Sequence, residues 1–162
     1  MSSTSASPSS VAAPARIDPR GQQFAAALTS VVLVAVLLLA PRPLGVALLA
    51  AQAVLFAAGA GLGVQRTPHA WLFKTFVRPR LGAPGELEDV TPPRFAQGVG
   101  LAFALVGLVG FLSGATVLGL VATGFALVAA LLNAVFGFCL GCEMYLLVRR
   151  IAGGRATKAV RA

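Results

Sequence analysis

The chain has 162 residues, of which 57% are apolar and 18 are glycine, and its mean hydropathy is +0.86. Soluble domains are only about half apolar, so this composition indicates a membrane protein. The formal net charge is +8, but charged residues make up only 11% of the chain and lie between long apolar runs, which argues against a nucleic-acid-binding face and makes the charges a guide to membrane topology.

The first part of the chain predicts a polar tail and two membrane-spanning helices. Residues 1–17 are rich in Ser, Ala and Pro and predict a disordered cytoplasmic tail, and they lack the basic start of a cleaved signal peptide. An apolar run covers residues 24–40, and "PRP" at residues 41–43 separates it from a second run over residues 44–62. Because about 20 apolar residues cross a bilayer, we expect the two runs to form a helical hairpin.

The segment after the second run, "HAWLFKTFVR", predicts a helix that lies in the membrane interface. Helical spacing places four of its residues on one apolar or weakly polar stripe: His69, Leu72, Phe73 and Phe76. Lys74 and Arg78 share a different, basic side. A helix of this kind lies flat at the lipid headgroups rather than crossing the bilayer.

The second half predicts another hairpin and a break near its end. A third apolar run covers residues 95–112, and an uninterrupted apolar stretch of 34 residues then extends from 115 to 148. As one helix that stretch would measure about 51 Å, which exceeds the hydrocarbon core of about 30 Å. We therefore expect a fourth span over residues 117–138, a short C-terminal interfacial helix, and a basic cytoplasmic tail over residues 153–162.

The predicted fold is thus an all-α integral membrane domain, residues 18–152, with four transmembrane helices arranged as two hairpins. With four spans, twelve basic residues fall on one side of the membrane: Arg16, Arg20, Arg66, Lys74, Arg78, Arg80, Arg94, Arg149, Arg150, Arg155, Lys158 and Arg161. Only Arg42 falls on the other side. By the positive-inside rule, this places both termini and the central loop in the cytoplasm and the protein in the cell inner (plasma) membrane.

The segment "GFCLGCEMYLLVRR" contains both cysteines of the chain, Cys139 and Cys142. On a helix their β-carbons would lie about 5 to 6 Å apart, close enough to pair after modest distortion. An unbroken helix places both thiols towards its negative end and disfavours the reactive thiolate. If the helix breaks at Gly137 or Gly141, a new helix from Glu143 onward places Cys142 in its N-terminal turn, so Cys142 is expected to attack and Cys139 to resolve.

Two structural alternatives accompany the thiol hypothesis. Asn133, Gly137 and Gly141 are spaced by four residues, which predicts a helix-packing face where a neighbouring helix approaches closely. In that case the cysteines simply pack as small apolar side chains. A metal site would need further ligands, for which His69 and Glu143 are candidates, but two thiolates and a lone histidine do not make a convincing set. No metal or cofactor is predicted.

Familiar catalytic motifs are absent from the sequence, so it predicts no other reaction. The sequence contains no Walker phosphate loop, no G-x-S-x-G and no H-E-x-x-H. Gln52 and Asn133 are the strongly polar side chains deep in the predicted spans. They are expected to hydrogen-bond between helices, and the lack of a charged residue at mid-membrane makes transport the less favoured hypothesis.

Four stretches of the chain resemble a known bacterial membrane family, the domain of unknown function 4395. They are "IDPRGQQF", "LFKTFVRPRLGAPGELED", "PPRFAQGVG" and "LNAVFGFCLGCEMYLLVRR". This family's activity is unassigned, so the resemblance implies a class of protein rather than a reaction. In addition, "GCEMYLL" is similar to the G-C-P-L-Y-x-L ending of small two-span domains that are sometimes fused to rhodaneses. Cys142 and Tyr145 match that ending, Glu143 replaces its proline, and the resemblance implies a role in handling sulfur.

The sequence therefore favours a membrane thiol-redox or sulfur-relay component that uses a cytoplasm-facing C-x-x-C pair, Cys139 and Cys142. Such a protein would have the lipid bilayer and thioredoxin-like or rhodanese-like proteins as partners, with no nucleic acid, and it could form oligomers. A non-catalytic membrane scaffold or accessory subunit is the alternative, and a small transporter is the third hypothesis.

Overall fold

Four long apolar helices dominate the computed structural model, which describes residues 16–84 and 86–159, with side chains described to residue 152. The four helices are α1 (Pro19–Leu39), α2 (Pro43–Gly61), α4 (Thr91–Leu112) and α5 (Thr116–Phe136). Each is long and apolar enough to cross a membrane. The chain is therefore a multi-pass all-α membrane protein, as its composition predicts. Most of the expected N-terminal tail, residues 1–17, lies outside the described residues.

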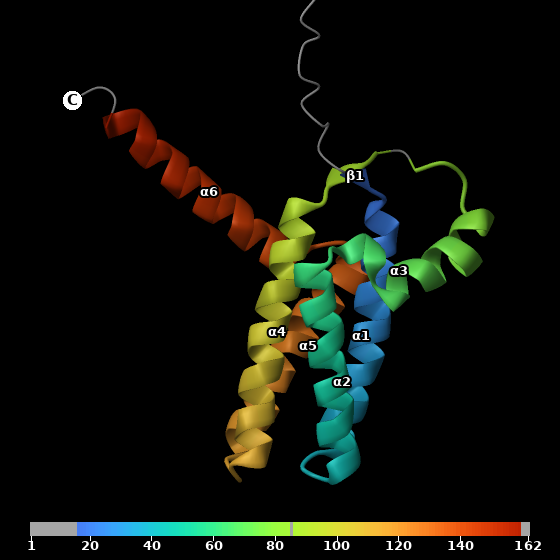
Figure 1. Cartoon of the computed structure of the whole chain (residues 1–162), viewed down its shortest axis with the longest axis vertical. Helices are drawn as coiled ribbons and strands as arrows, with labels where there is room; N and C mark the ends of the chain where they lie inside the picture. The colour runs from blue at the N-terminus through green and yellow to red at the C-terminus, as the bar shows by residue number, and fades with distance from the viewer. Residues whose placement is uncertain (1–15, 85, 160–162) are drawn as a thin grey trace, which may run out of the picture.

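The long helices form an elongated bundle with both tight turns at the same end (Figure 1). One turn joins α1 to α2 and contains Arg42, and the other joins α4 to α5 at Ser113 and Gly114. Around the bundle, α1 packs against α2 and α5, and α4 packs against α2 and α5. Hence α1 and α5, far apart in the sequence, lie side by side.

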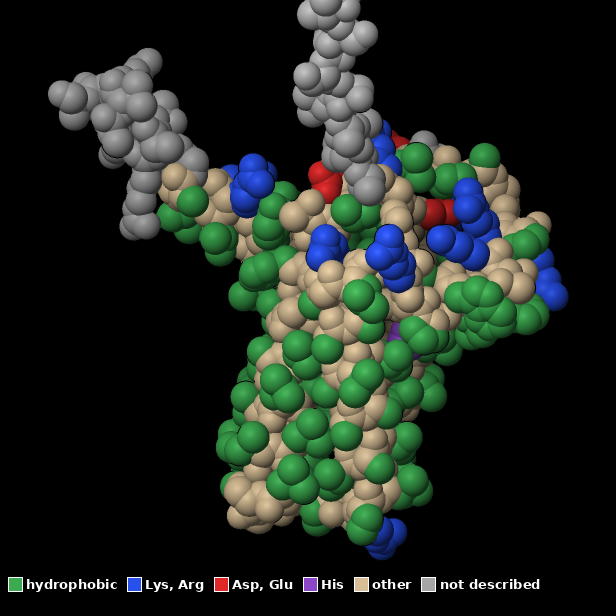
Figure 2. Space-filling model, in the orientation of Figure 1, with side chains coloured by type: hydrophobic (Ala, Val, Ile, Leu, Met, Phe, Trp, Pro, Cys, Tyr) green, Lys and Arg blue, Asp and Glu red, His purple; other side chains and the backbone are tan. Residues whose placement is uncertain are grey.

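The surface of the bundle separates charge from apolar side chains along its length. Figure 2 shows hydrophobic side chains along the helices, and Lys and Arg side chains gathered at the end that carries the α2–α4 connection and α6. We call this the basic end. Arg42 lies at the opposite end, in the tight turn between α1 and α2.

Glycine and other small residues let the helices approach closely. An added β-carbon at Gly110 of α4 would lie 2.8 Å from the α-carbon of Gly119 in α5. At Gly100 of α4 it would lie 2.8 Å from the ring of Phe56 in α2. Within lipid, helices associate through this close packing and through hydrogen bonds rather than through the hydrophobic effect. One such bond joins the Gln52 amide nitrogen of α2 to the Thr29 hydroxyl of α1 at 3.4 Å.

The ends of α1 and α4 extend beyond the apolar runs into polar sequence. Asp18 caps α1 by accepting a hydrogen bond from the Arg20 N–H at 3.0 Å, so the helix begins at Pro19 rather than at Phe24. At the start of α4, the Asp89 carboxylate accepts hydrogen bonds from both the N–H and the hydroxyl of Thr91 at 2.7 Å, and these bonds lower the pKa of Asp89. A two-residue strand pair, β1 (Arg16–Ile17) with β2 (Glu88–Asp89), ties these two helix starts together.

The α2–α4 connection is a series of short helical pieces rather than one helix. After η1 (Val64–Arg66), the chain forms α3 (Pro68–Leu72), the π-helical η2 (Phe73–Val77) and η3 (Arg78–Arg80). Phe73 is buried against Gly21 and Phe24 of α1, whereas Phe76 is exposed and lies edge-on to Trp71. The expected single stripe of His69, Leu72, Phe73 and Phe76 is therefore divided, because the π-helical turn rotates Phe76 away from Phe73.

Candidate functional site

The long C-terminal apolar stretch breaks at Gly137. This residue has φ +67° and ψ 10°, a left-handed conformation that glycine adopts without the cost of a β-carbon. Its N–H donates to the Asn133 carbonyl oxygen at 3.0 Å and ends α5. A new helix, α6 (Leu140–Ala159), begins three residues later and leaves the side of the bundle (Figure 1).

Both cysteines lie where α6 begins. Cys139 occupies the N-cap position, since its carbonyl oxygen accepts the first helical hydrogen bond from the Glu143 N–H at 3.0 Å. Cys142 lies in the first turn. From the sequence we expected this helix to begin at Glu143, with Cys139 outside it. It begins at Leu140 instead, so the free N–H groups of its first turn lie next to Cys139, and Cys142 is its third residue.

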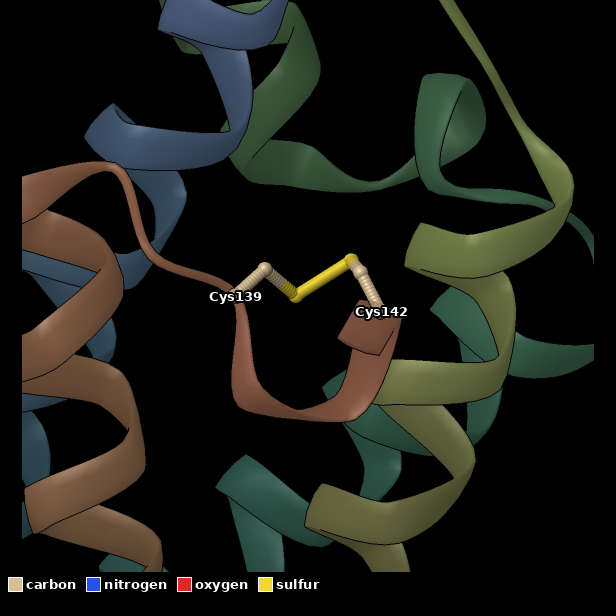
Figure 3. The surroundings of a disulfide bond; sticks show 2 residues. All are labelled: Cys139 and Cys142. Atoms are coloured by element: carbon tan, nitrogen blue, oxygen red, sulfur yellow. A yellow bond between two sulfur atoms is a disulfide. The ribbon is translucent and has the colours of Figure 1, made fainter. Parts of the chain in front are cut away.

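Cys139 and Cys142 are joined as a disulfide, with their α-carbons 5.2 Å apart. Figure 3 shows the bond above the turn that leads into α6, with α4 on one side and α5 and α1 on the other. Both residues are half-buried. The pair is thus positioned at the junction of three bundle helices instead of on the free part of α6.

Contacts with α4 fix the start of α6. An added β-carbon at Gly141 would lie 2.7 Å from both the α-carbon and the β-carbon of Ala96, so the backbones of the two helices touch there. One turn further on, the rings of Tyr145 and Phe95 lie 5.7 Å apart. Arg149 donates to the Tyr145 hydroxyl at 3.1 Å. These contacts hold the disulfide against the bundle.

A cavity of about 460 Å³ lies beneath the disulfide, between the helices, and we call it the disulfide cavity. Its wall includes Cys139 and Cys142, three aromatic side chains, and four amide side chains. The aromatic residues are Phe56, Phe103 and Phe125, and the amides are Gln22, Gln23, Gln97 and Asn133. This cavity was not predicted from the sequence. Four small residues of its wall leave the space open: alanines 126, 129 and 130, and Gly100.

A second cavity of about 310 Å³ lies between α1, α2 and the α2–α4 connection. It shares Gln22, Ala25, Thr29 and Gln97 with the disulfide cavity, so the two spaces adjoin. Gln52 reaches it with a side-chain oxygen that is buried and has no hydrogen-bond partner. His69 also lines it, and burial lowers the pKa of this imidazole.

The residues singled out from the sequence fall into separate roles. Gly137 ends α5, and Gly141 packs against α4. Because α5 stops at Phe136, Asn133, Gly137 and Gly141 do not share the one continuous packing face that the sequence predicted. Asn133 lines the disulfide cavity with the cysteines, whereas His69 lines the adjoining one. Within residues 16–84 and 86–152, no three His, Cys, Asp or Glu side chains group as metal ligands.

Comparison with known proteins agrees with the resemblance seen in the sequence. Residues 17–150 match the family described as domain of unknown function, DUF4395. The chain belongs to the DUF4395 family. The match covers the four long helices, the loop between them and the cysteine pair. No curated protein and no solved structure matches the chain.

Proposed function

We propose that this DUF4395 protein is a membrane thiol-redox component in which Cys139 and Cys142 cycle between a disulfide and a dithiol. The observation that carries the proposal is the pairing of these cysteines at a helix N-terminus, in the wall of a cavity. Two cysteines that only filled space would have no need of either feature. A sulfur-relay variant, in which one thiol carries a persulfide, uses the same pair.

Helix geometry favours Cys139 as the attacking thiol. A thiolate at an N-cap position accepts hydrogen bonds from the free N–H groups of the second and third helical residues, here Gly141 and Cys142. The helix dipole adds to this stabilisation. Cys142, inside the first turn, is then the resolving thiol, which reverses the order expected from the sequence.

A soluble dithiol of the thioredoxin type is the natural reductant. One of its thiolates attacks the Cys139 sulfur, the S–S bond breaks, and Cys142 leaves as a thiolate that takes up a proton. The partner's second thiolate then displaces Cys139 from the mixed disulfide. The partner ends as a disulfide, and the pair ends as two thiols.

The charge distribution supports a cytoplasmic orientation for this exchange. In the proposed topology the four long helices cross the plasma membrane as two hairpins, and the basic end, both termini and the cysteine pair face the cytoplasm. The pieces α3 and η2, with exposed Trp71 and Phe76, lie at the lipid headgroups, as does the apolar side of α6.

Single-cysteine variants test the proposal. In native membranes, Cys142→Ser should leave a Cys139 thiol that alkylates faster at neutral pH than the Cys142 thiol of Cys139→Ser. The wild-type disulfide should also form a mixed disulfide, through Cys139, with a reduced thioredoxin that keeps only its attacking cysteine, because that partner has no second thiolate to release Cys139. The double Cys→Ser variant serves as the matched control. If both thiols alkylate slowly, never pair on mild oxidation and never trap thioredoxin, the cysteines only pack, and the protein is a scaffold or accessory subunit.

A further inference from the structure

The redox function proposed above, on which this inference rests, requires an oxidant that returns the reduced cysteine pair to the disulfide. A reduced pair must pass two electrons to an oxidant. The cavity that adjoins its sulfur atoms lies among the four long apolar helices and receives wall residues from each of them. The wall also includes Arg20 and Glu88 at the basic end, so the cavity extends from the charged end of the bundle into its apolar part. Its apolar part suits an oxidant that is soluble in the membrane.

Two aromatic residues of the cavity wall come from α4 and α5, which pack against each other. Phe103 of α4 and Phe125 of α5 both line the cavity, with ring centroids 6.2 Å apart. Phe125 is also 61% exposed on the apolar surface, so one residue belongs both to the cavity wall and to the lipid-facing side. The helices are closely packed at their turn end, where Gly110 meets Gly119, and make room towards the basic end.

The inner wall is equipped for a flat ring that carries carbonyl oxygens. Gln22 and Gln23 come from α1, Gln97 from α4 and Asn133 from α5. Within residues 16–84 and 86–152, no side-chain hydrogen bond involves any of these four amides. Their N–H groups are thus available to carbonyl acceptors, while Phe56, Phe103 and Phe125 offer faces for ring stacking.

We propose that the disulfide cavity binds the head group of a lipid-soluble quinone, which oxidises the cysteine pair. The cavity volume of about 460 Å³ falls within the range of about 300 to 1,000 Å³ found for small-molecule sites. The three aromatic rings and the alanines of the wall favour an apolar ring over a charged oxidant such as glutathione disulfide. An electron-transfer metal is not needed, because a quinone accepts both electrons itself.

The reaction balances with the two thiols and one quinone. The Cys139 thiolate attacks a ring carbon of the quinone and forms a C–S bond. The Cys142 thiolate then attacks the Cys139 sulfur, so that the S–S bond forms and the C–S bond breaks, and the electron pair stays on the ring. The two protons released by the thiols end on the two quinol oxygens. The amide N–H groups stabilise the negative charge that develops on those oxygens before they are protonated.

A cavity-filling variant with a matched neighbour tests this proposal. Ala129 of α5 lines the cavity, whereas the adjacent Val128 is 55% exposed and is not part of its wall. The full chain, purified in detergent and reduced with dithiothreitol, is mixed with decylubiquinone or with the water-soluble thiol oxidant diamide. Thiols that remain are counted by alkylation mass shift, and quinol formation is followed by absorbance.

Decylubiquinone should oxidise the wild-type pair with one quinol formed per disulfide. Ala129→Phe should slow this oxidation by about tenfold or more, because the added ring overfills the cavity, whereas Val128→Phe should retain the wild-type rate. Diamide should oxidise all three proteins at similar rates, which shows that the variants are folded with reactive thiols.

The outcomes separate the two proposals. If diamide re-forms the disulfide but decylubiquinone does not, or if Ala129→Phe and Val128→Phe react with the quinone equally fast, the quinone proposal is wrong and the thiol-redox function stands. If neither oxidant re-forms the Cys139–Cys142 bond, the redox function itself is wrong.

Discussion

Gly141→Ala should loosen the start of α6 because there is no room for a β-carbon at this position. The new atom would lie 2.7 Å from both the α-carbon and the β-carbon of Ala96, whereas ordinary contacts begin at 3.4 Å. The two helices must therefore move apart by about 0.7 Å, since backbone cannot rotate out of the way. Overpacking of this kind costs on the order of 1 to 3 kcal/mol, and the better helix propensity of alanine returns at most about 1 kcal/mol.

The thermal midpoint in detergent should consequently fall by roughly 2 to 8 °C. The disulfide should also re-form more slowly after reduction, because Cys142 follows Gly141 directly. Gly98→Ala in α4 is the matched control: its added β-carbon has no heavy atom within 4 Å, so the midpoint should hold or rise. Equal midpoints for Gly141→Ala and Gly98→Ala would refute the close contact between α6 and α4.

Three further predictions follow from the loops and turns. Burial lowers the pKa of His69 below its ordinary value of 6.5, so the unfolded chain binds a proton more readily than the folded chain, and stability should fall as the pH drops below that value. His69→Gln should weaken the decrease of the thermal midpoint between about pH 7 and about pH 5. The same decrease in wild type and His69→Gln would show that burial of this imidazole does not cause it. Gly137→Ala, at φ +67°, should destabilise by about 1 to 2 kcal/mol in the same melt, which an unchanged midpoint would refute. Reporter fusions at residue 88 and at the C-terminus should read as cytoplasmic and one at residue 114 as external, and a cytoplasmic signal at 114 would overturn the proposed topology.

The four long helices could be predicted from the sequence because hydropathy is a local property. Runs of apolar residues separated by "PRP" and "SG" identify each helix without knowledge of its neighbours. The exact starts could not, since α1 gains its first turn from a hydrogen bond between Asp18 and Arg20 that a hydropathy average does not register. The rotated positions of Phe73 and Phe76 likewise depend on a π-helical turn, which has no clear sequence signal.

Part of the candidate site could be predicted from the sequence. Spacing alone identified Cys139 and Cys142 as a pair, and the length of the apolar stretch required a break near them. Which glycine breaks the helix depends on tertiary contacts: Gly141 is needed against Ala96 of α4, and Gly137 is free to adopt positive φ. The disulfide cavity depends on how α4 and α5 diverge after their close contact at Gly110 and Gly119, which no local pattern encodes.

The redox state of the pair in native membranes tests the central claim most directly. Membranes that contain the full chain are treated with dithiothreitol or with diamide, quenched in acid, and alkylated with a maleimide that adds a measurable mass to each free thiol. We predict that the wild-type chain shifts between no and two labelled thiols, reversibly and without an intermediate that carries one. A chain that keeps both thiols free under diamide, or keeps the Cys139–Cys142 bond under dithiothreitol, would contradict the proposed redox cycle.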